Sequence, residues 1–144
     1  MTTIRCARTY DAPALAALCD ELGYPATRQQ VVTRLAAIEA SPTAKVFVAE
    51  DSHGIVIGWL HIVQTPHLVD DDTAEILGLV VADGTRGRGI GAALLDAAET
   101  WSRARGAREL CVRSRVERER AHGFYERAGF VRSKTQHAFR KPFA

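Results

Sequence analysis

The stretch LVVADGTRGRGIGAALL, residues 79–95, decides the fold class of this 144-residue chain. An apolar run rich in valine ends, a loop with alternating glycines follows, and a helical pattern begins at once. The first N–H groups of a helix lack partners within it, and partial positive charge collects there. Glycines let an anion approach this backbone, and two arginines add formal charge. The stretch predicts a cradle for a pyrophosphate group, formed by Arg86, Gly87, Arg88, Gly89, Ile90, Gly91 and Ala92.

Several kinds of site use such a glycine-rich loop. A nucleoside triphosphate loop would need G-x-x-x-x-G-K-[ST], but no lysine stands between Lys45 and Lys134. The dinucleotide fingerprint G-x-G-x-x-[GA] is present, but only about 50 residues follow it, and the next expected strand ends in arginine rather than an acidic ribose-binding residue. A glycine-rich turn with no ligand is a further alternative.

Three motifs in order carry a resemblance to a known family. The loop matches [RQ]-x-x-G-x-[GA], the strand residues Leu79, Val80 and Val81 precede it, and AHGFYERAGF follows at residues 121–130. This order resembles the GCN5-related N-acetyltransferase (GNAT) superfamily, whose downstream pattern is A-x-x-F-Y-x-x-x-G-[FY]. The segment around residues 116–125 is similar to bacterial small-molecule amine acetyltransferases of the aminoalkylphosphonate and aminoglycoside type.

The resemblance implies an enzyme that moves an acetyl group from acetyl-CoA to a primary amine, with no metal. We expect a small-molecule acceptor and direct transfer in a ternary complex, because no cysteine in the motifs offers a nucleophile. A protein N-terminus or lysine is the alternative acceptor, and a coenzyme-A-binding regulatory module without turnover is the alternative class. The coenzyme contacts implied are Leu79, Val80 and Val81, the cradle from Arg86 to Ala92, and Ala121, Phe124 and Tyr125.

Two residues are candidates for the proton transfers. Tyr125 stands at the tyrosine of the family motif, where a phenol can protonate the departing thiolate, although a packing role stays open. Glu75 stands four residues before Leu79, as the glutamate base does in histone acetyltransferases of this superfamily. In a regular strand Glu75 would share a face with Leu79, although an exposed strand-end glutamate is the alternative. Gly78 between them suggests a bulge.

Composition and charge agree with one soluble domain over residues 1–144. Hydrophobic residues make up 47% and charged residues 25%, and no apolar run reaches the length of a membrane span. Residues 86–144 hold 14 Lys and Arg against six Asp and Glu, which suits an anionic coenzyme, while the acidic remainder suits a cationic amine. We therefore expect acetyl-CoA and a small amine as partners, with no nucleic acid and no membrane, and a homodimer as an open alternative. Three widely spaced cysteines predict reduced core thiols in a cytoplasmic protein.

The periodicities predict an α/β fold of the GNAT type, in the order β-α-α-β-β-β-α-β-α-β, with a mixed sheet and helices on both faces. Asp11 is expected to cap the first helix, and Thr27 with Gln30 forms a capping box for the second. His61 and His67, with the acidic residues 70–72, could be metal ligands or belong to a solvated loop. The strands are expected at 4–8, 45–49, 55–63, 73–81, 108–113 and 130–139, and the two later helices at 89–105 and 117–128.

Overall fold

The computed structural model describes residues 2–144, which form two compact units, one ending at Val112 and one beginning at Arg113. The first unit contains β1 (Thr3–Cys6), a 3₁₀ turn (Thr9–Asp11), α1 (Ala12–Leu22), α2 (Arg28–Ala40), β2 (Ala44–Glu50), β3 (Val56–Thr65), β4 (Thr73–Val81), α3 (Ile90–Ala104) and β5 (Glu109–Val112). The second unit contains α4 (Glu119–Arg127) and the segment after it.

The sheet of the first unit has the strand order β1-β2-β3-β4-β5. The strands from β1 to β4 pair antiparallel, and β5 joins β4 in parallel. Parallel neighbours need a long crossover, which α3 and its loops supply between β4 and β5. The predicted mixed sheet is thus confirmed.

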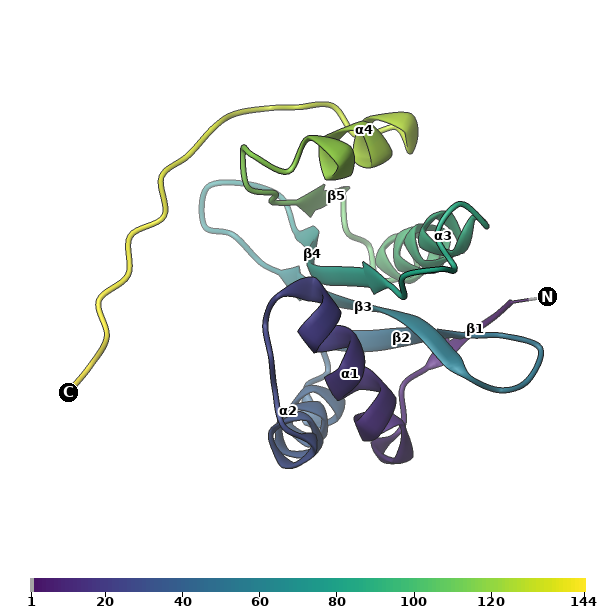
Figure 1. Ribbon diagram of the computed structural model, residues 1–144. Helices are drawn as coiled ribbons and strands as arrows, with labels where there is room; N and C mark the ends of the chain where they lie inside the picture. The colour runs from purple at the N-terminus through teal and green to yellow at the C-terminus, as the bar shows by residue number, and fades with distance from the viewer. Residues whose placement is uncertain (1) are drawn as a thin grey trace. The chain divides into compact units, whose positions relative to one another are not determined.

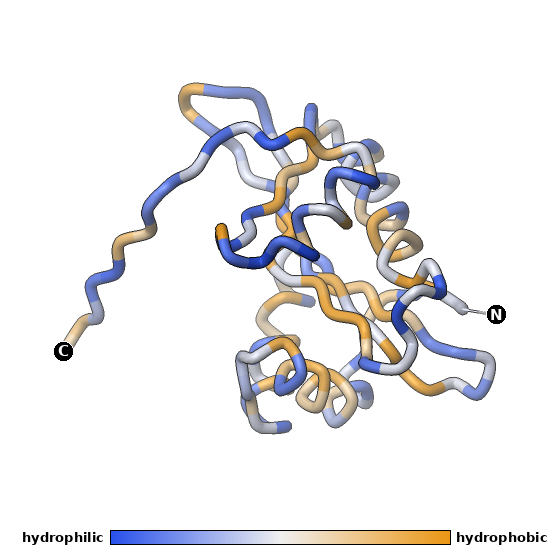
Figure 2. Tube along the Cα trace, turned by 45° about the horizontal axis from the view of Figure 1, so that its top comes forward, coloured by the Kyte–Doolittle hydropathy of each residue, from blue (hydrophilic) through white to orange (hydrophobic). Residues whose placement is uncertain are grey.

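Helices cover both faces of this sheet (Figure 1). A Cβ added to Gly58 would lie 3.3 Å from Leu94 of α3, whereas the next residue, Trp59, packs against the core under α1 and α2. Consecutive strand residues point to opposite faces, so α3 lies on one face and the α1–α2 pair on the other. Figure 2 shows apolar residues concentrated along the strands and polar residues in the loops.

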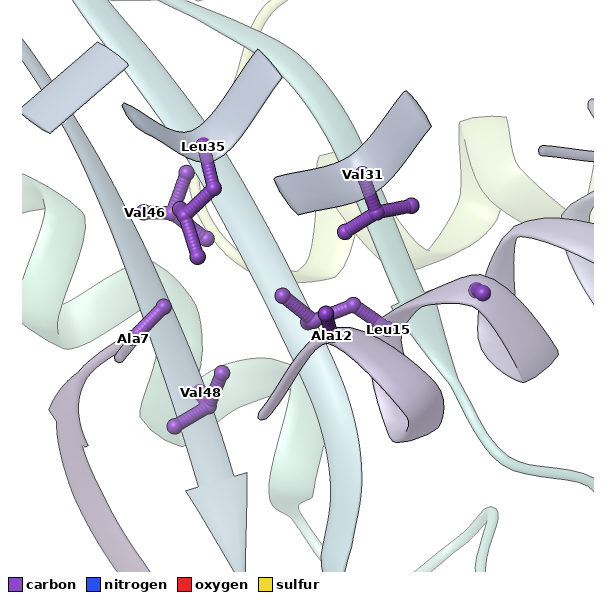
Figure 3. Packing of buried hydrophobic residues seen from close by; sticks show 8 residues of the cluster. Ala7, Ala12, Leu15, Val31, Leu35, Val46 and Val48 are labelled. Carbon is purple, nitrogen blue, oxygen red and sulfur yellow. The ribbon is translucent and has the colours of Figure 1, made fainter. Parts of the chain in front are cut away.

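The core under α1 and α2 follows the two periodicities of its elements (Figure 3). Val31 and Leu35, four residues apart on α2, meet Val46 and Val48, which alternate along β2. Leu15 of α1 completes this cluster, and Val48 is fully buried. Each such side chain contributes about 1.5–3 kcal/mol when fully buried. The face of the sheet that α1 and α2 cover is also the face on which the candidate base, Glu75, lies.

The first two helices begin differently. Thr27 and Gln30 form the predicted capping box, with hydrogen bonds of 3.1 Å and 3.0 Å between each side chain and the other residue's N–H group. Asp11 occupies the N-cap position of α1, but its side chain does not cap the helix. It accepts hydrogen bonds from the Arg5 side chain and the Arg8 N–H group instead. Burial acts to raise the pKa of Asp11, and these hydrogen bonds outweigh it, so the pKa is lowered.

Two expectations are wrong. No strand forms over residues 130–139, and within this segment Val131 and Phe139 are 88% and 93% exposed. An extended segment becomes a strand when a neighbour takes up its N–H and C=O groups, and no strand of residues 2–144 does so here. The cysteines are not core residues either, because Cys6 is exposed and Cys19 and Cys111 are only partly buried. Across residues 2–144, none of the helices combines the length and the apolar character needed to cross a membrane.

Candidate functional site

Strand β4 has two halves with different surroundings. Residues Thr73–Ile76 pair with β3 on one side and with β5 on the other, where β5 ends at Val112 opposite Ile76. Beyond Ile76, no strand of residues 2–144 pairs with β4 on the β5 side. An unpaired edge presents a row of N–H and C=O groups to any extended molecule laid beside it. The residues 79–81 predicted to bind coenzyme belong to this open half.

A bulge separates the two halves. Gly78 of β4 lies opposite His61 of β3, but Ile76 lies opposite Ile62, so Leu77 is an extra residue. The sequence prediction of a bulge at Gly78 is therefore confirmed. A Cβ at Gly78 would lie 2.7 Å from the Trp59 ring, so this position has no room for a larger residue unless the indole moves.

The loop after β4 has a backbone geometry compatible with the predicted cradle. Gly87 and Gly89 have φ angles of +84° and +75°, which L side chains rarely adopt, and no atom lies within 4 Å of where a Cβ would be. Open space therefore stands in front of both residues. Ile90, which begins α3, is 2% exposed and anchors the helix start in the core. The backbone of the loop is therefore open to a ligand, while the start of α3 behind it is held in place by the buried Ile90.

The start of α3 carries no side-chain cap. Its first N–H groups face the cradle without an intrahelical partner, and the helix dipole adds partial positive charge. Arg86 lies beside this start and forms an ion pair of 3.0 Å with Asp83. The Asp83 N–H group donates to Glu21 at the end of α1, over 2.8 Å. The arrangement can bind a phosphate or pyrophosphate group through backbone donors and Arg86.

The bulge changes the face on which Glu75 lies. Glu75 pairs with Val63 and Leu79 pairs with Leu60. Val63 and Leu60 are three residues apart on β3, so they point to opposite faces. Directly paired residues share a face, so the expectation that Glu75 points to the same side as Leu79 is wrong. Glu75 is partly buried on the α1–α2 face.

Two further side chains share that face. Trp59 and His61 alternate with Val63 along β3. Burial lowers the pKa of His61, so its ring is neutral at pH 7. From the sequence, His61 is only a candidate metal ligand and Trp59 has no expected role in the site. No group of three metal-binding side chains occurs within residues 2–144, and His67 is hydrogen-bonded to Thr73 Oγ1 over 2.8 Å.

The candidate acid Tyr125 lies on α4 in the second unit. Its ring makes edge-to-face contacts with Phe124 and Phe130, at centroid distances of 5.2 and 5.6 Å. Burial raises the pKa of Tyr125, partly offset by the positive charge of Arg118, so the hydroxyl keeps its proton at neutral pH. Ala121 lies one turn earlier on the same helix.

Comparisons with known proteins extend these observations. A model of the acetyltransferase (GNAT) family matches residues 13–130. The aminoglycoside N(6')-acetyltransferase type 1 of Stenotrophomonas maltophilia is 31% identical over 144 residues, which cover 97% of this chain and 93% of the relative.

Two solved structures share the fold. A transcriptional regulator from Bacillus halodurans has a TM-score of 0.88 at 24% identity, over 98% of this chain and all of that one. Aminoglycoside N-acetyltransferase AAC(6')-Iy in complex with CoA has a TM-score of 0.87 at 19% identity, over 98% and 95%.

The family match runs from α1 to the end of α4 and includes both the cradle and the Tyr125 motif. The predicted α/β fold and the acetyl-CoA donor are therefore confirmed. The open β4 edge and the uncapped α3 start offer what an acyl-CoA requires, which is a partner for an extended arm and a seat for a pyrophosphate. The chain belongs to the GNAT acetyltransferase family and is an acetyl-CoA-dependent acetyltransferase.

Proposed function

We propose that the chain acetylates a primary amine of an aminoglycoside-type amino sugar by direct transfer within a ternary complex. The observation that carries this proposal is the 31% identity, over 97% of the chain, to an aminoglycoside N(6')-acetyltransferase. The acidic loop of Asp70, Asp71 and Asp72 before β4 suits a polycationic acceptor. Within the proposal, the two units act as one catalytic domain over residues 1–144.

The coenzyme would be held mainly by backbone. Acetyl-CoA supplies an acetyl group activated as a thioester, and its pantetheine arm would lie along Leu79, Val80 and Val81. The pyrophosphate would lie on the α3 start, with Arg86 and Arg88 as cationic partners. Val80 and Ile90 have buried side chains, so each can contribute only its backbone there. Ala121, Phe124 and Tyr125 of α4 complete the proposed contacts.

Two side chains would then move protons. The acceptor amine reaches the site mostly as an ammonium ion, and Glu75 takes its proton to free the nitrogen lone pair. The nitrogen attacks the thioester carbonyl, the C–N bond forms and the C–S bond breaks. The departing thiolate takes a proton from the Tyr125 hydroxyl, and the new amide nitrogen loses its extra proton to solvent. Glu75 then releases its proton to solvent and Tyr125 takes one back, so that one proton is released per turnover. Burial keeps the phenol protonated, so it has a proton to donate as the C–S bond breaks.

The proposed partners beyond the substrates are few. A homodimer is proposed because Phe139 and Phe143 of the C-terminal segment are each 93% exposed. Neither nucleic acid nor a membrane is a proposed partner. The proposed location is the cytoplasm, where cysteine thiols stay reduced.

A panel of acceptors tests the function, with free thiol release as the readout. We expect turnover with aminoglycosides and none with lysine peptides or peptide N-termini. Turnover with peptides alone would replace the proposed acceptor by a protein, and acetyl-CoA binding without release of thiol would indicate a regulatory module.

The role of Glu75 is tested by Glu75→Gln, which keeps the size but cannot take the proton. The loss of activity should be greatest at low pH, where the amine is mostly protonated, and should shrink as hydroxide increases. A pH profile unchanged in shape and height would show that another group is the base.

A further inference from the structure

Two ring nitrogens on one face of β3, Nε1 of Trp59 and Nε2 of His61, are buried without a hydrogen-bond partner among residues 2–144. The residues are two positions apart on the strand, so both rings lie on the α1–α2 face. Each of the two residues as a whole is only partly buried. A third such atom, Ser114 Oγ, belongs to the second unit.

An unpartnered buried polar atom lowers the stability of a fold, because it loses water and gains nothing. An apolar residue at position 61 would fill the same place without that cost, as Leu60 and Ile62 do on the other face. The Trp59 ring has in addition taken the space above Gly78. Two such polar atoms on one face of the same strand therefore indicate a ligand that pairs with them.

We propose that Trp59 and His61 form a subsite that binds a hydroxyl group of the acceptor substrate. This inference rests on the proposed amino-sugar function. An indole N–H can only donate, so its partner must offer a lone pair, which an ammonium ion does not have. A hydroxyl can accept from Trp59 and can donate to or accept from the neutral His61 ring. A hydroxyl-bearing amine fits both atoms, whereas an ammonium group can only donate and so cannot pair with the Trp59 N–H group.

The subsite lies next to the proposed base. Glu75 pairs with Val63, and His61 is the next residue of β3 on the same face. Such diagonal neighbours have Cα atoms roughly 7–8 Å apart, which one substituted sugar ring can span. An acceptor whose amine meets Glu75 would thus place its ring over His61 and Trp59, displacing the groups that cover their nitrogens.

Steady-state kinetics of His61→Leu with kanamycin and with 1,5-diaminopentane test the subsite. The KM for kanamycin should rise about threefold to tenfold, the value of one net hydrogen bond, while kcat and the KM for the diamine stay unchanged. The melting temperature should stay the same or rise, because an unpaired buried nitrogen has been removed. In His61→Gln, whose amide reaches the position of Nε2, the wild-type KM should return.

His67→Leu is the matched control, because it removes a histidine that does have a partner, Thr73 Oγ1. Its melting temperature should fall and its KM values should not change. The subsite proposal is overturned if His61→Leu leaves the kanamycin KM unchanged, raises both KM values equally, or melts at a lower temperature. A wild-type enzyme that does not acetylate kanamycin would contradict the proposed function instead. Calorimetric binding of kanamycin to both proteins would then decide on the subsite, and equal affinities would reject it.

Discussion

The N-termini of α2 and α3 differ in how the backbone N–H groups of their first turns are satisfied. At α2, Thr27 and Gln30 satisfy each other's N–H groups with their own side chains. At α3, the N-cap is Gly89, which has a φ of +75° and no side chain to offer. Both helices expose N–H donors at their first turn, but only α2 closes that turn with its own residues.

Under the proposed function, this difference separates a helix start that is closed for stability from one that stays open for a ligand. A capped start gains stability from its cap, typically about 1 kcal/mol. An uncapped start in a folded enzyme forgoes that stability and keeps donors available for an anion. The open half of β4 likewise keeps its hydrogen-bonding groups available, since no strand of residues 2–144 pairs with its edge on the β5 side just before the cradle. Five predictions test this comparison.

Tyr125→Phe should separate coenzyme binding from chemistry and has the largest expected effect. The α3 start remains intact and phenylalanine keeps the ring of the Tyr125 contact, so acetyl-CoA should still bind. Turnover should fall roughly 10²- to 10⁴-fold, because the thiolate loses its acid. Burial raises the pKa of Tyr125 above its ordinary value near 10, so the wild type should keep this acid in its protonated form throughout the neutral range. Unchanged turnover in the variant would leave Tyr125 with a packing role.

Acetyl-CoA itself should stabilise the protein, since it supplies the missing cap. At a ligand concentration 100-fold above Kd, the free energy of unfolding should increase by about 2.7 kcal/mol. The effect should weaken with added salt, because Arg86 and Arg88 face phosphates. Differential scanning calorimetry of coenzyme-free protein measures it, and no shift with excess acetyl-CoA would reject the cradle.

Gly89→Val should lower acetyl-CoA affinity at least tenfold, about 1.4 kcal/mol, because a branched side chain fills the open space before the N–H donors. Gly54→Val is a matched control, since Gly54 has a φ of +77° and equally free surroundings, but lies in the β2–β3 hairpin. Both variants should lose similar stability. Equal coenzyme affinity in the two, measured by titration calorimetry, would mean that Gly89 serves only the turn.

Thr27→Ala should show the complementary behaviour at the capped helix. The free energy of unfolding should fall by about 1 kcal/mol, because the Gln30 N–H group loses its acceptor. Acetyl-CoA affinity should not change. Urea denaturation and coenzyme titration together check both statements, and a loss of affinity would show that the two helix starts are coupled.

Asp83→Asn should have the smallest effect, with the opposite sign. The ion pair of Asp83 with Arg86 is solvent-exposed, at 73% and 49% side-chain exposure, so it is worth at most about 1 kcal/mol. Releasing Arg86 for a phosphate should raise acetyl-CoA affinity by up to about fivefold. Asp96→Asn on the exposed side of α3 removes the same charge without that pair and should change little. A weaker affinity in Asp83→Asn would mean that Asp83 orders the loop.

Features set by neighbouring residues in the chain could be predicted from the sequence. The bounds of β4 agree with the expected 73–81, and α3 begins one residue after the expected start, because glycine, helix period and strand composition act locally. The predicted capping box at Thr27 and the bulge at Gly78 are also local, since each depends on a few adjacent residues.

Features that depend on a partner strand could not be predicted. The face of Glu75 follows from its register with β3, which the period of β4 alone does not contain. A strand is expected over residues 130–139, but a strand also needs a neighbour. To predict the proposed subsite at Trp59 and His61, one would have to know which buried polar atoms lack a hydrogen-bond partner. The available sequence signal is a tryptophan on one strand and a glycine on the neighbouring strand, since the Trp59 ring occupies the space that a side chain at Gly78 would need.

Because of the bulge, the pairing of β4 with β3 depends on how many residues lie between Ile76 and Gly78 and not on which residue stands there. Leu77 is 54% exposed, so most side chains should be accepted there. Deleting it would instead remove the extra residue, and one part of the strand would have to shift by one position. Either Glu75 would turn into the core beneath α3, or the open half would lose its alignment with the cradle. Homologues that keep this activity should therefore vary freely at this position but should show neither deletions nor insertions between the residues equivalent to Glu75 and Leu79.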